Sequence, residues 1–372
     1  MVAAFLLGGP GASSASASDE LGYPSSIGTE RNPDDLPASP GRMSGTFVGQ
    51  GPPTSMASAM KSTTFLVSET GQAYRLPQTD DIAGYVPALS SDGTLVAYFP
   101  DSDGYAIRDL VSGEMTTFAR VRSGDIGREP YMFDGSRAWW SPDGTRLLIG
   151  TAPMVVLSLD GTITEASPPR GRSAYPVGWL DDDIAWMRWR GSDPDAPDSA
   201  ELVVSPVAGG PGRTVQLEDV DKLSDVVGAG VGVSPDGSSL AVVTTDGEES
   251  GQFTLYSTAD GSVTARSTVD KTINPNCPLS WASGKPAVAG AMRSDALLSM
   301  SGETIVRSRD QFAPCSVWAA DALAGPRDSG GVLGAASSSP AYVVVAAVVA
   351  VGAATAGWFL VRRRRRALAP TS

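Results

Sequence analysis

A short phrase recurs along the middle of this sequence and constrains its fold more than any other feature. It is LSSDGTLVAYF at residues 89–99, WSPDGTRLLIG at 140–150 and VSPDGSSLAVV at 233–243, with weaker copies at 179–189 and 280–290. Each copy predicts a strand, a tight turn and a second strand, because Asp bonds nearby backbone N–H groups and Gly tolerates a positive φ. The repeated turn pairs therefore have a structural interpretation: Asp92-Gly93, Asp143-Gly144 and Asp236-Gly237.

A second turn glycine follows each copy after one further strand. With a related glycine near the N-terminus, these positions are Gly71, Gly113, Gly161, Gly210, Gly261 and Gly302. They are spaced 42, 48, 49, 51 and 41 residues apart. A period of this size with four strands per unit is typical of the blades of a β-propeller.

The two ends of the repeat region are incomplete in a complementary way. Residues 63–77 supply only the last two strands of a blade, whereas PCSVWAADALAG at 314–325 is similar to the first two. Aligned with the preceding copy, Cys315 matches Cys277 and Trp318 matches Trp281. Joining the two halves completes a sixth blade, so we predict a six-bladed ring closed by both chain ends, with no unpaired inner edge.

The strand–turn–strand copies with SPDG turns resemble the WD40-like repeats of the TolB-type β-propeller superfamily over about residues 61–325. The resemblance implies an all-β propeller whose function is located in its loops and not in the fold itself. Tryptophans precede the turn in four copies, at Trp140, Trp179, Trp281 and Trp318. We expect these four side chains to pack between blades.

An uncharged run of 21 residues, 341–361, follows the repeats. As a helix it would extend roughly 30 Å, the thickness of the hydrocarbon core of a bilayer. Tyr342 and Trp358 lie near its ends, where aromatic side chains prefer the membrane interface, and Arg362 and Arg363 begin a run of five arginines. The positive-inside rule predicts one transmembrane helix with a cytoplasmic tail at 362–372 and the propeller outside. No LPxTG-type motif precedes the span, so we interpret it as a retained anchor.

The N-terminal region has the composition of a disordered segment. Residues 1–60 are rich in Ser, Gly, Pro and Ala without a sustained apolar period, and 326–340 have the same character, which we interpret as a stalk before the membrane. The stretch VAAFLLGG with a nearby A-x-A-like segment resembles part of a signal peptide that lacks its basic region. We expect a signal clipped by a misplaced start codon, and the alternative is an Ala- and Ser-rich linker.

Composition excludes several classes of function. The chain has no histidine, which excludes Ser-His-Asp and Cys-His catalytic sites and His-containing zinc sites. Its net charge is −13 even with the five clustered arginines, and phosphate binding depends on Lys and Arg, so a nucleic-acid partner is not expected. The most acidic loop, residues 191–201, offers oxygen ligands for calcium, but two prolines and the lack of a suitably placed glycine favour a solvated loop.

The two cysteines predict one disulfide bond. Cys277 and Cys315 occupy equivalent positions in strands that open consecutive blades, and an exported protein lies in an oxidising compartment. The alternative is a pair of buried thiols that align only because the blades are homologous.

These features together predict a membrane-anchored, extracytoplasmic sensor or binding module with a protein or cell-envelope ligand. No catalytic residue, metal site or cofactor is indicated by the sequence. Two alternatives remain: a membrane-tethered hydrolase that uses carboxylates in the propeller funnel, and a scaffold subunit of an envelope complex. Convergent acids in the funnel would favour the hydrolase, and an exposed apolar patch on one propeller face would favour the scaffold.

Overall fold

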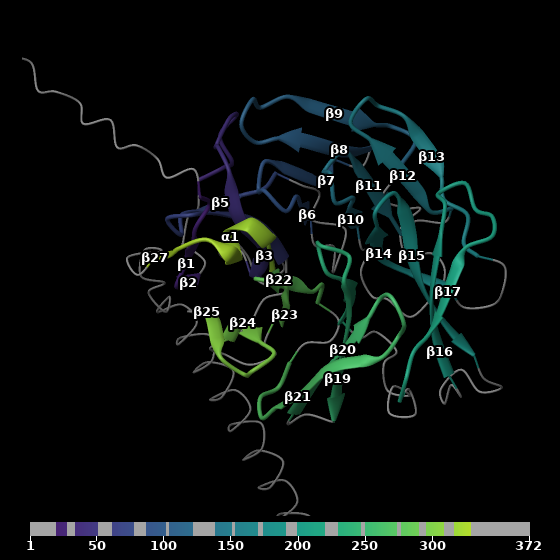
Figure 1. Ribbon diagram of the computed structural model, residues 1–372. Coiled ribbons are helices and arrows are strands. Elements are labelled where there is room, and N and C mark those ends of the chain that lie inside the picture. Colours follow the sequence, from purple (N-terminus) through teal and green to yellow (C-terminus); the bar gives the residue numbers. More distant parts are fainter. Residues whose placement is uncertain are drawn as a thin grey trace, which may run out of the picture.

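The computed structural model shows a ring of small β-sheets (Figure 1). The structure describes residues 20–27, 34–50, 62–77, 87–101, 104–121, 138–150, 153–169, 174–190, 199–219, 230–246, 250–273, 277–289, 295–308 and 316–328.

Four of the sheets are each built from one continuous stretch of chain, with four antiparallel strands in sequence order. They are blade 2 with β6 (Ala88–Leu89), β7 (Leu95–Asp101), β8 (Gly104–Asp109) and β9 (Met115–Phe118); blade 3 with β10 (Ala138–Trp140), β11 (Arg146–Ile149), β12 (Val155–Ser158) and β13 (Ile163–Glu165); blade 4 with β14 (Ala174–Leu180), β15 (Asp183–Arg190), β16 (Ser199–Ser205) and β17 (Arg213–Gln216); and blade 5 with β18 (Gly230–Val233), β19 (Ser239–Asp246), β20 (Ser250–Ser257) and β21 (Val263–Val269).

The other two blades contain segments from both ends of the chain. Blade 6 has β22 (Ser280–Ala282), β23 (Lys285–Val288), β24 (Asp295–Ser299) and β25 (Thr304–Ser308), with β2 (Ser26–Ile27) added in parallel at its outer edge. Blade 1 has β26 (Ser316–Trp318), β3 (Met43–Gln50), β4 (Ser62–Ser68) and β5 (Ala73–Arg75). The predicted all-β propeller of six blades, closed by both chain ends, is therefore confirmed.

The way in which the shared blade is divided corrects the sequence-based prediction. We expected two strands from each end, but the C-terminal segment gives one strand, β26, and the N-terminal segment gives three. The register pairs Ser316 with Phe47 and Trp318 with Gly45. The segment expected to form a second C-terminal strand is instead a short helix, α1 (Ala320–Ala324). Since β3 lies within residues 1–60, the prediction that this whole region is disordered was wrong, and residue 61 is too late a boundary for the propeller.

The physical reason for this error is the composition of β3. Its residues Ser44 and Thr46 are fully buried, as are Met43 and Phe47, so the strand has no alternation of polar and apolar residues. Gly45 is required by close packing, because a Cβ atom at that position would lie 2.6 Å from the ring of Trp318. Buried on both faces and rich in small residues, β3 has the local composition of a linker.

The N-terminal segment also crosses the outer rim of the ring. Tyr23–Pro24 (β1) pairs in parallel with Arg327–Asp328 (β27), and Asp35 forms a bridge with Arg75 at the outer edge of blade 1. Further along, the Gly41 N–H donates to the carbonyl of Leu110 in blade 2. Residues 20–27 and 34–42 thus contact blades 6, 1 and 2 before the chain enters β3, and they cover sheet edges that would otherwise be exposed.

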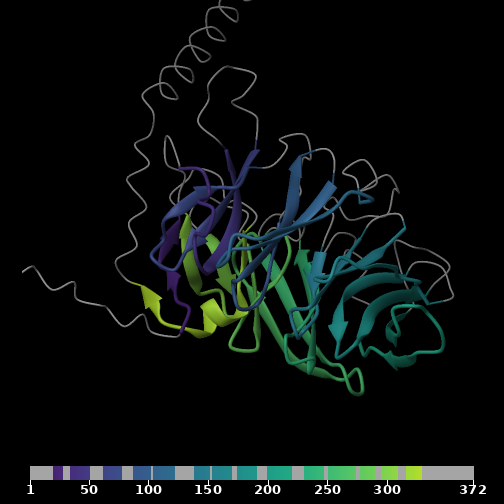
Figure 2. The ribbon, with the colours of Figure 1, turned by 90° about the horizontal axis from the view of Figure 1, so that it is seen from above.

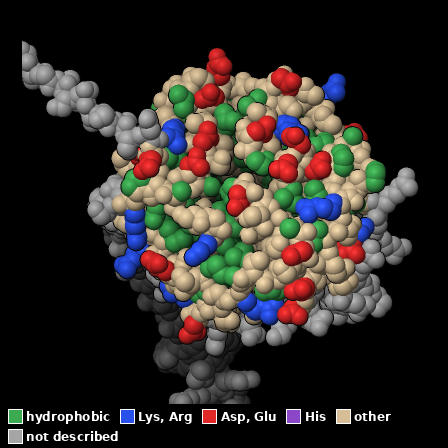
Figure 3. Space-filling model, in the orientation of Figure 1, with side chains coloured by type: hydrophobic (Ala, Val, Ile, Leu, Met, Phe, Trp, Pro, Cys, Tyr) green, Lys and Arg blue, Asp and Glu red, His purple; other side chains and the backbone are tan. Residues whose placement is uncertain are grey.

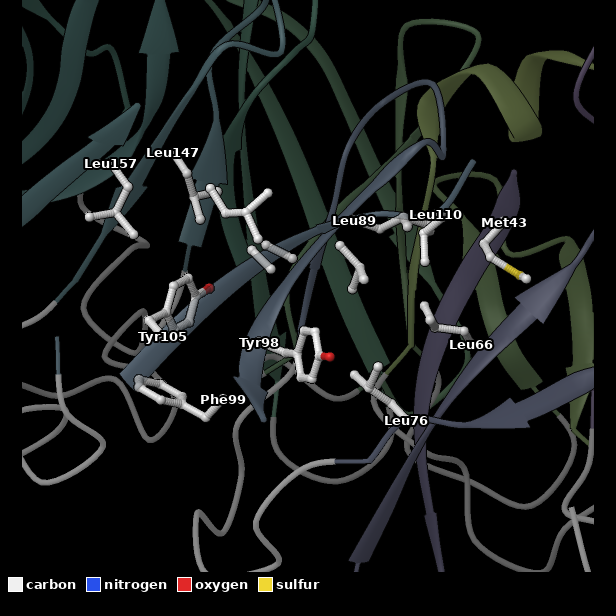
Figure 4. Close-up of a cluster of buried hydrophobic side chains, with 14 of the residues drawn as sticks. Met43, Leu66, Leu76, Leu89, Tyr98, Phe99, Tyr105, Leu110, Leu147 and Leu157 are labelled. Carbon is white, nitrogen blue, oxygen red and sulfur yellow. The ribbon is translucent and has the colours of Figure 1, made fainter. Parts of the chain in front are cut away.

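The hydrophobic core lies between neighbouring blades. Figure 4 shows the cluster between blades 1, 2 and 3, in which Met43 and Leu66 of blade 1 face Leu89 and Tyr98 of blade 2. Other clusters join blades 3 and 4, blades 4 and 5, blades 5 and 6, and blades 6 and 1. Each blade is therefore stabilised mainly by its two neighbours, as the burial of both faces of its sheet requires.

Two ends of the propeller can be distinguished by their connections. One end, which we call the turn face, carries the turns between first and second strands, the turns between third and fourth strands, and α1. In the side view of Figure 2, α1 and β27 lie along the lower edge. Figures 1 and 3 look onto this face.

Candidate functional site

The first strands of the six blades surround a central channel. A cavity of about 190 Å³ lies among them and is lined by residues from β6, β10, β14, β18, β22 and β26 and from the segments that adjoin them. Its walls are mainly apolar, with contributions from Leu89, Trp139, Val177, Val233, Leu279 and Val317. None of the described residues that line it is charged. Because the lining continues to Ser141, Pro142, Ser234 and Pro235 in the turns, the cavity reaches the turn face.

The tryptophans of the first strands close the gaps between blades, as the sequence predicted. The Trp140 indole N–H donates to the Ala88 carbonyl of blade 2 over 3.3 Å, and the Trp179 indole N–H donates to the Trp139 carbonyl of blade 3 over 2.8 Å. Trp281 and Trp318 are 7% and 3% exposed. Indole groups of this kind fix the spacing of the inner strands and thereby the width of the channel.

The SPDG turns at the channel mouth are held by a repeated set of hydrogen bonds. In blade 3 the Ser141 hydroxyl donates to Asp143 Oδ1 over 2.5 Å, and the Thr145 N–H donates to the same oxygen over 3.1 Å. The matching bonds of blade 2 join Ser90 and Thr94 to Asp92, and those of blade 5 join Ser234 and Ser238 to Asp236. Gly93, Gly144 and Gly237 have φ values of 71°, 67° and 70°.

These bonds keep the turn carboxylates charged. Hydrogen bonds from Ser141 and Thr145 lower the pKa of Asp143 to about 2. The pKa of Asp236 is also below its usual value, mainly because Ser234 donates to it. For Asp92 burial opposes the shift, yet the bonds from Ser90 and Thr94 still bring its pKa below normal. All three side chains are therefore anionic at neutral pH.

The other blades place different residues at the same position. Blade 4 has Asp181 and Asp182, both exposed, and Asp181 has a φ of 53°. Blade 6 has a turn at Ser283 and Gly284 followed by Lys285, which is exposed. In blade 1 helix α1 takes this place and presents the exposed Asp321. Five blades thus contribute carboxylates around the mouth, and the sixth contributes a lysine.

One arginine connects two of these turns. The Arg146 guanidinium lies over the Trp179 ring, 4.8 Å from its centroid, and pairs with the Asp182 carboxylate. This contact partly neutralises the negative charge of the blade 4 turn and connects that blade to blade 3. Figure 3 shows acidic side chains spread over the turn face, with hydrophobic and some basic side chains between them.

Several predicted features lie outside the described residues. These are Cys315, the acidic loop at 191–198, the predicted span at 341–361 with Tyr342 and Trp358, and the basic tail with Arg362 and Arg363. Cys277 is fully buried and is not a free thiol in the structure. Since Cys315 is not described, its pairing with Cys277 stays a prediction.

The described ranges contain neither a candidate membrane span nor a candidate metal cluster. No helix within them is long and apolar enough to cross a membrane. No group of three or more acidic or cysteine side chains in these ranges could hold a metal ion.

Sequence reasoning identified the turns and the tryptophans but missed the walls of the channel. Val233 and Leu279 come from different blades, and no local pattern marks them as neighbours. The usable signal was positional, because in every copy the lining residues lie within a few positions of the turn. Lys285 and Arg146 also follow their turns directly and could have been found in this way.

Comparisons with known proteins find similarity among solved structures. No protein-family model matches the sequence, and no curated protein matches it. Among solved structures, TolB from Acinetobacter baumannii is similar with a TM-score of 0.49 and 14% identity, over 74% of this chain and 66% of that chain.

Two further solved structures are similar at the same low level of identity. The β-propeller domain of Cps50 (Swd1) from Myceliophteria thermophila has a TM-score of 0.35 and 15% identity, over 57% of this chain and 64% of that chain. An oligogalacturonate lyase in complex with manganese has a TM-score of 0.41 and 14% identity, over 77% and 78%. The chain spans less than two thirds of the TolB and Cps50 chains.

The fold itself places this chain in a class. Six radially arranged four-stranded blades with SPDG turns are the architecture of TolB-like and WD40-like β-propellers. Neither a ligand nor a reaction follows from that architecture, because propellers carry many functions.

Proposed function

We propose that this protein is a non-enzymatic binding module whose propeller lies outside the cytoplasmic membrane, anchored there by the single span at residues 341–361. The observation that carries the binding role is the composition of the channel mouth. An apolar cavity opens on the turn face, and the described residues that line it are uncharged while carboxylates surround it. Concave apolar surfaces with a few polar groups at the margin are typical of binding sites.

The lining supports binding over catalysis. A general acid or base has to reach the substrate, and among the described lining residues there is no carboxylate, lysine or cysteine. Three of the four described serines that line the cavity have structural partners for their hydroxyl groups: Ser141 and Ser234 bond to the aspartates of their own turns, and Ser280 accepts the Trp318 N–H. A hydrolase that uses funnel carboxylates would need acids at these positions.

The partner is proposed to be a protein. The turn face is acidic, which disfavours nucleic acids and anionic lipid surfaces. Its outline of short rigid turns around a cavity offers many backbone and side-chain contacts at one end of a rigid scaffold. No cofactor is required for this role.

Site-specific photo-cross-linking tests the binding role. A photoreactive amino acid at Ser91, which is exposed and lines the cavity, should give a discrete adduct in intact cells of the organism that carries the protein. The same group at Thr268, exposed on the outer strand of blade 5, is the matched control and should give none. No adduct from either position, or equal adducts from both, would contradict the proposal, and several different adducts from Ser91 would favour the scaffold alternative.

The membrane topology has its own test. Protease added to intact protoplasts should digest the propeller, and a propeller that survives until the membrane is lysed would show the opposite location. Replacing the arginines of the run 362–366 by neutral residues should weaken the orientation, because they form the main charge difference across the span.

A further inference from the structure

We infer that the channel mouth binds an extended segment of a partner protein that carries one bulky apolar side chain next to lysine or arginine residues. This inference rests on the proposed binding function and adds the chemistry of the partner. Three observations carry it: the size and lining of the cavity, the carboxylates fixed around its mouth, and the distribution of those carboxylates over the blades.

The cavity fits one large apolar side chain. Its volume is about 190 Å³, and an apolar cavity of about 150 Å³ in another protein is known to take up benzene. The walls come from Leu89, Trp139, Val177, Leu279 and Val317, which can surround an aromatic or branched side chain with dispersion contacts. A charged side chain would lose its hydration here without gaining a partner among the described lining residues.

Carboxylates outnumber cationic side chains around the mouth, where Lys285 and Arg146 also lie, so the mouth favours positive charge in a partner. Asp143 and Asp236 are exposed in their turns, and hydrogen bonds from serine and threonine hold their pKa values below the ordinary range. The same bonds fix the positions of the carboxylates, so little ordering is needed when a cation binds. Asp181 and Asp321 add two more exposed acids.

The arrangement of the acids favours an extended chain over a small molecule. Carboxylates lie at the mouth on blades 1, 3, 4 and 5, on more than one side of the cavity, as the ring order requires. A segment that crosses the mouth can place its apolar side chain in the cavity and basic residues on both flanks against these acids. Figure 3 shows hydrophobic and acidic side chains interspersed on the turn face, with one acidic group close to the middle of this face.

Fluorescence anisotropy with three labelled nine-residue peptides tests the inference on the purified full chain. The first has a central tryptophan flanked by lysines, the second has alanine in place of the tryptophan, and the third has glutamates in place of the lysines. The first peptide should bind about tenfold or more tightly than either of the others, because it alone meets both requirements. Equal binding of all three would overturn the inference.

Two sets of variants locate the site. Val317→Trp should fill the cavity and weaken binding of the first peptide about tenfold, and Leu279→Trp serves the same purpose if the first variant does not fold. The double variant Asp181→Asn with Asp321→Asn should weaken binding about fivefold at about 20 mM salt and less at about 500 mM. Asparagine tolerates the positive φ of residue 181, so the backbone of that turn is retained.

The matched control removes the same charge from the outer rim of the same face. Glu114→Gln with Glu303→Gln changes two exposed acids in turns between third and fourth strands, and binding should stay within about twofold. If this control weakens binding as much as Asp181→Asn with Asp321→Asn does, the acidic face attracts the peptide non-specifically, and the inference is overturned. So would unchanged binding to a folded cavity-filled variant, or equally tight binding of N-acetyltryptophanamide, which has no flanks.

The two proposals fail in distinguishable ways. If the Ser91 photo-cross-link persists while all three peptides bind equally or not at all, the protein has a partner of different chemistry. If no cross-link forms at Ser91 in cells, the binding function itself is wrong, whatever the peptides do.

Discussion

Blades 1 and 3 have the same four-stranded form but are held together by different means. In blade 3 the first two strands are joined by an SPDG turn, and all four strands follow one another in the chain. In blade 1 the first strand, β26, comes from the opposite end of the chain from β3, so no turn connects them. At the point where the ring closes, non-covalent contacts therefore take the place of a turn.

The contacts that replace the turn come from blade 2, from the N-terminal segment and from the residue that follows β26. The Ala319 N–H donates to the Ser44 carbonyl over 2.9 Å, and the Ser44 hydroxyl donates to the Gly22 carbonyl. The Met43 N–H bonds to Gly93 of blade 2. Blade 1 is therefore the place where we expect the ring to open first, and the following experiments examine that difference.

The largest effect on stability is expected from truncation at the N-terminus. Deleting residues 1–55 removes β1, β2 and β3, leaves β26 without its partner strand and exposes the core of blade 1. A typical domain has a free energy of unfolding of about 5–15 kcal/mol, so this loss should abolish the cooperative thermal transition. Deleting only residues 1–19 removes none of the described contacts and should leave the transition in place. Calorimetry of both truncated chains measures these transitions. A cooperative transition in the chain that lacks residues 1–55 would show that the ring does not need an intact blade 1.

The predicted disulfide is expected to have the next largest effect. A bridge between Cys277 and Cys315 would link the start of blade 6 to the strand that closes blade 1, around a loop of about 38 residues. The chain-entropy model gives about 3–4 kcal/mol for such a loop, reduced by any strain. Reducing agent should lower the midpoint of thermal unfolding of the wild type but not that of a Cys277→Ser, Cys315→Ser variant. Two alkylatable thiols in unreduced protein would refute the bridge.

A single added methyl group should distinguish the closing strand pair, β26 and β3, from an ordinary first strand. In Gly45→Ala the new Cβ would lie 2.6 Å from the Trp318 ring, and such overpacking costs about 1–3 kcal/mol. Gly232→Ala in β18 of blade 5 is the matched control, since its new Cβ meets only side-chain atoms at 3.7 Å or beyond. Urea denaturation should therefore show a lower free energy of unfolding for Gly45→Ala. For Gly232→Ala the free energy of unfolding should change by no more than about 0.5 kcal/mol. Equal losses would mean that the β26–β3 contact is no tighter than other inner-strand contacts.

The comparison of these blades also shows which parts of the fold could be predicted from the sequence. The contiguous blades were predictable because each contains its own signal: Asp143 and Gly144 define a turn without reference to distant residues. The partner of β26 was not predictable, because Ser44, Gly45 and Thr46 are small or polar residues whose burial depends on Trp318, far away in the chain. The same holds for the channel, since Val233 and Leu279 become neighbours only when the ring is complete.

The smallest effect on stability is expected from the SPDG turn, which is present in blade 3 and absent from blade 1. Asp143 has its pKa lowered to about 2 by the bonds from Ser141 and Thr145, below the usual 3.8. A carboxyl whose pKa is lower in the folded state stabilises that state above its unfolded pKa, and the contribution is lost as the pH falls from about 4 to 2. Because Asp143 is exposed, the contribution should be at most about 1 kcal/mol.

Asp143→Asn should therefore unfold at a slightly lower temperature than the wild type at pH 7, and the two should converge near pH 2. Asp181→Asn in blade 4 is the control, because asparagine tolerates the positive φ of residue 181 and no serine or threonine of its own turn bonds to that side chain among the described contacts. Its midpoint at pH 7 should lie close to that of the wild type. A difference between Asp143→Asn and the wild type that persists at pH 2 would mean that the turn is stabilised by its shape and not by the charge of its aspartate.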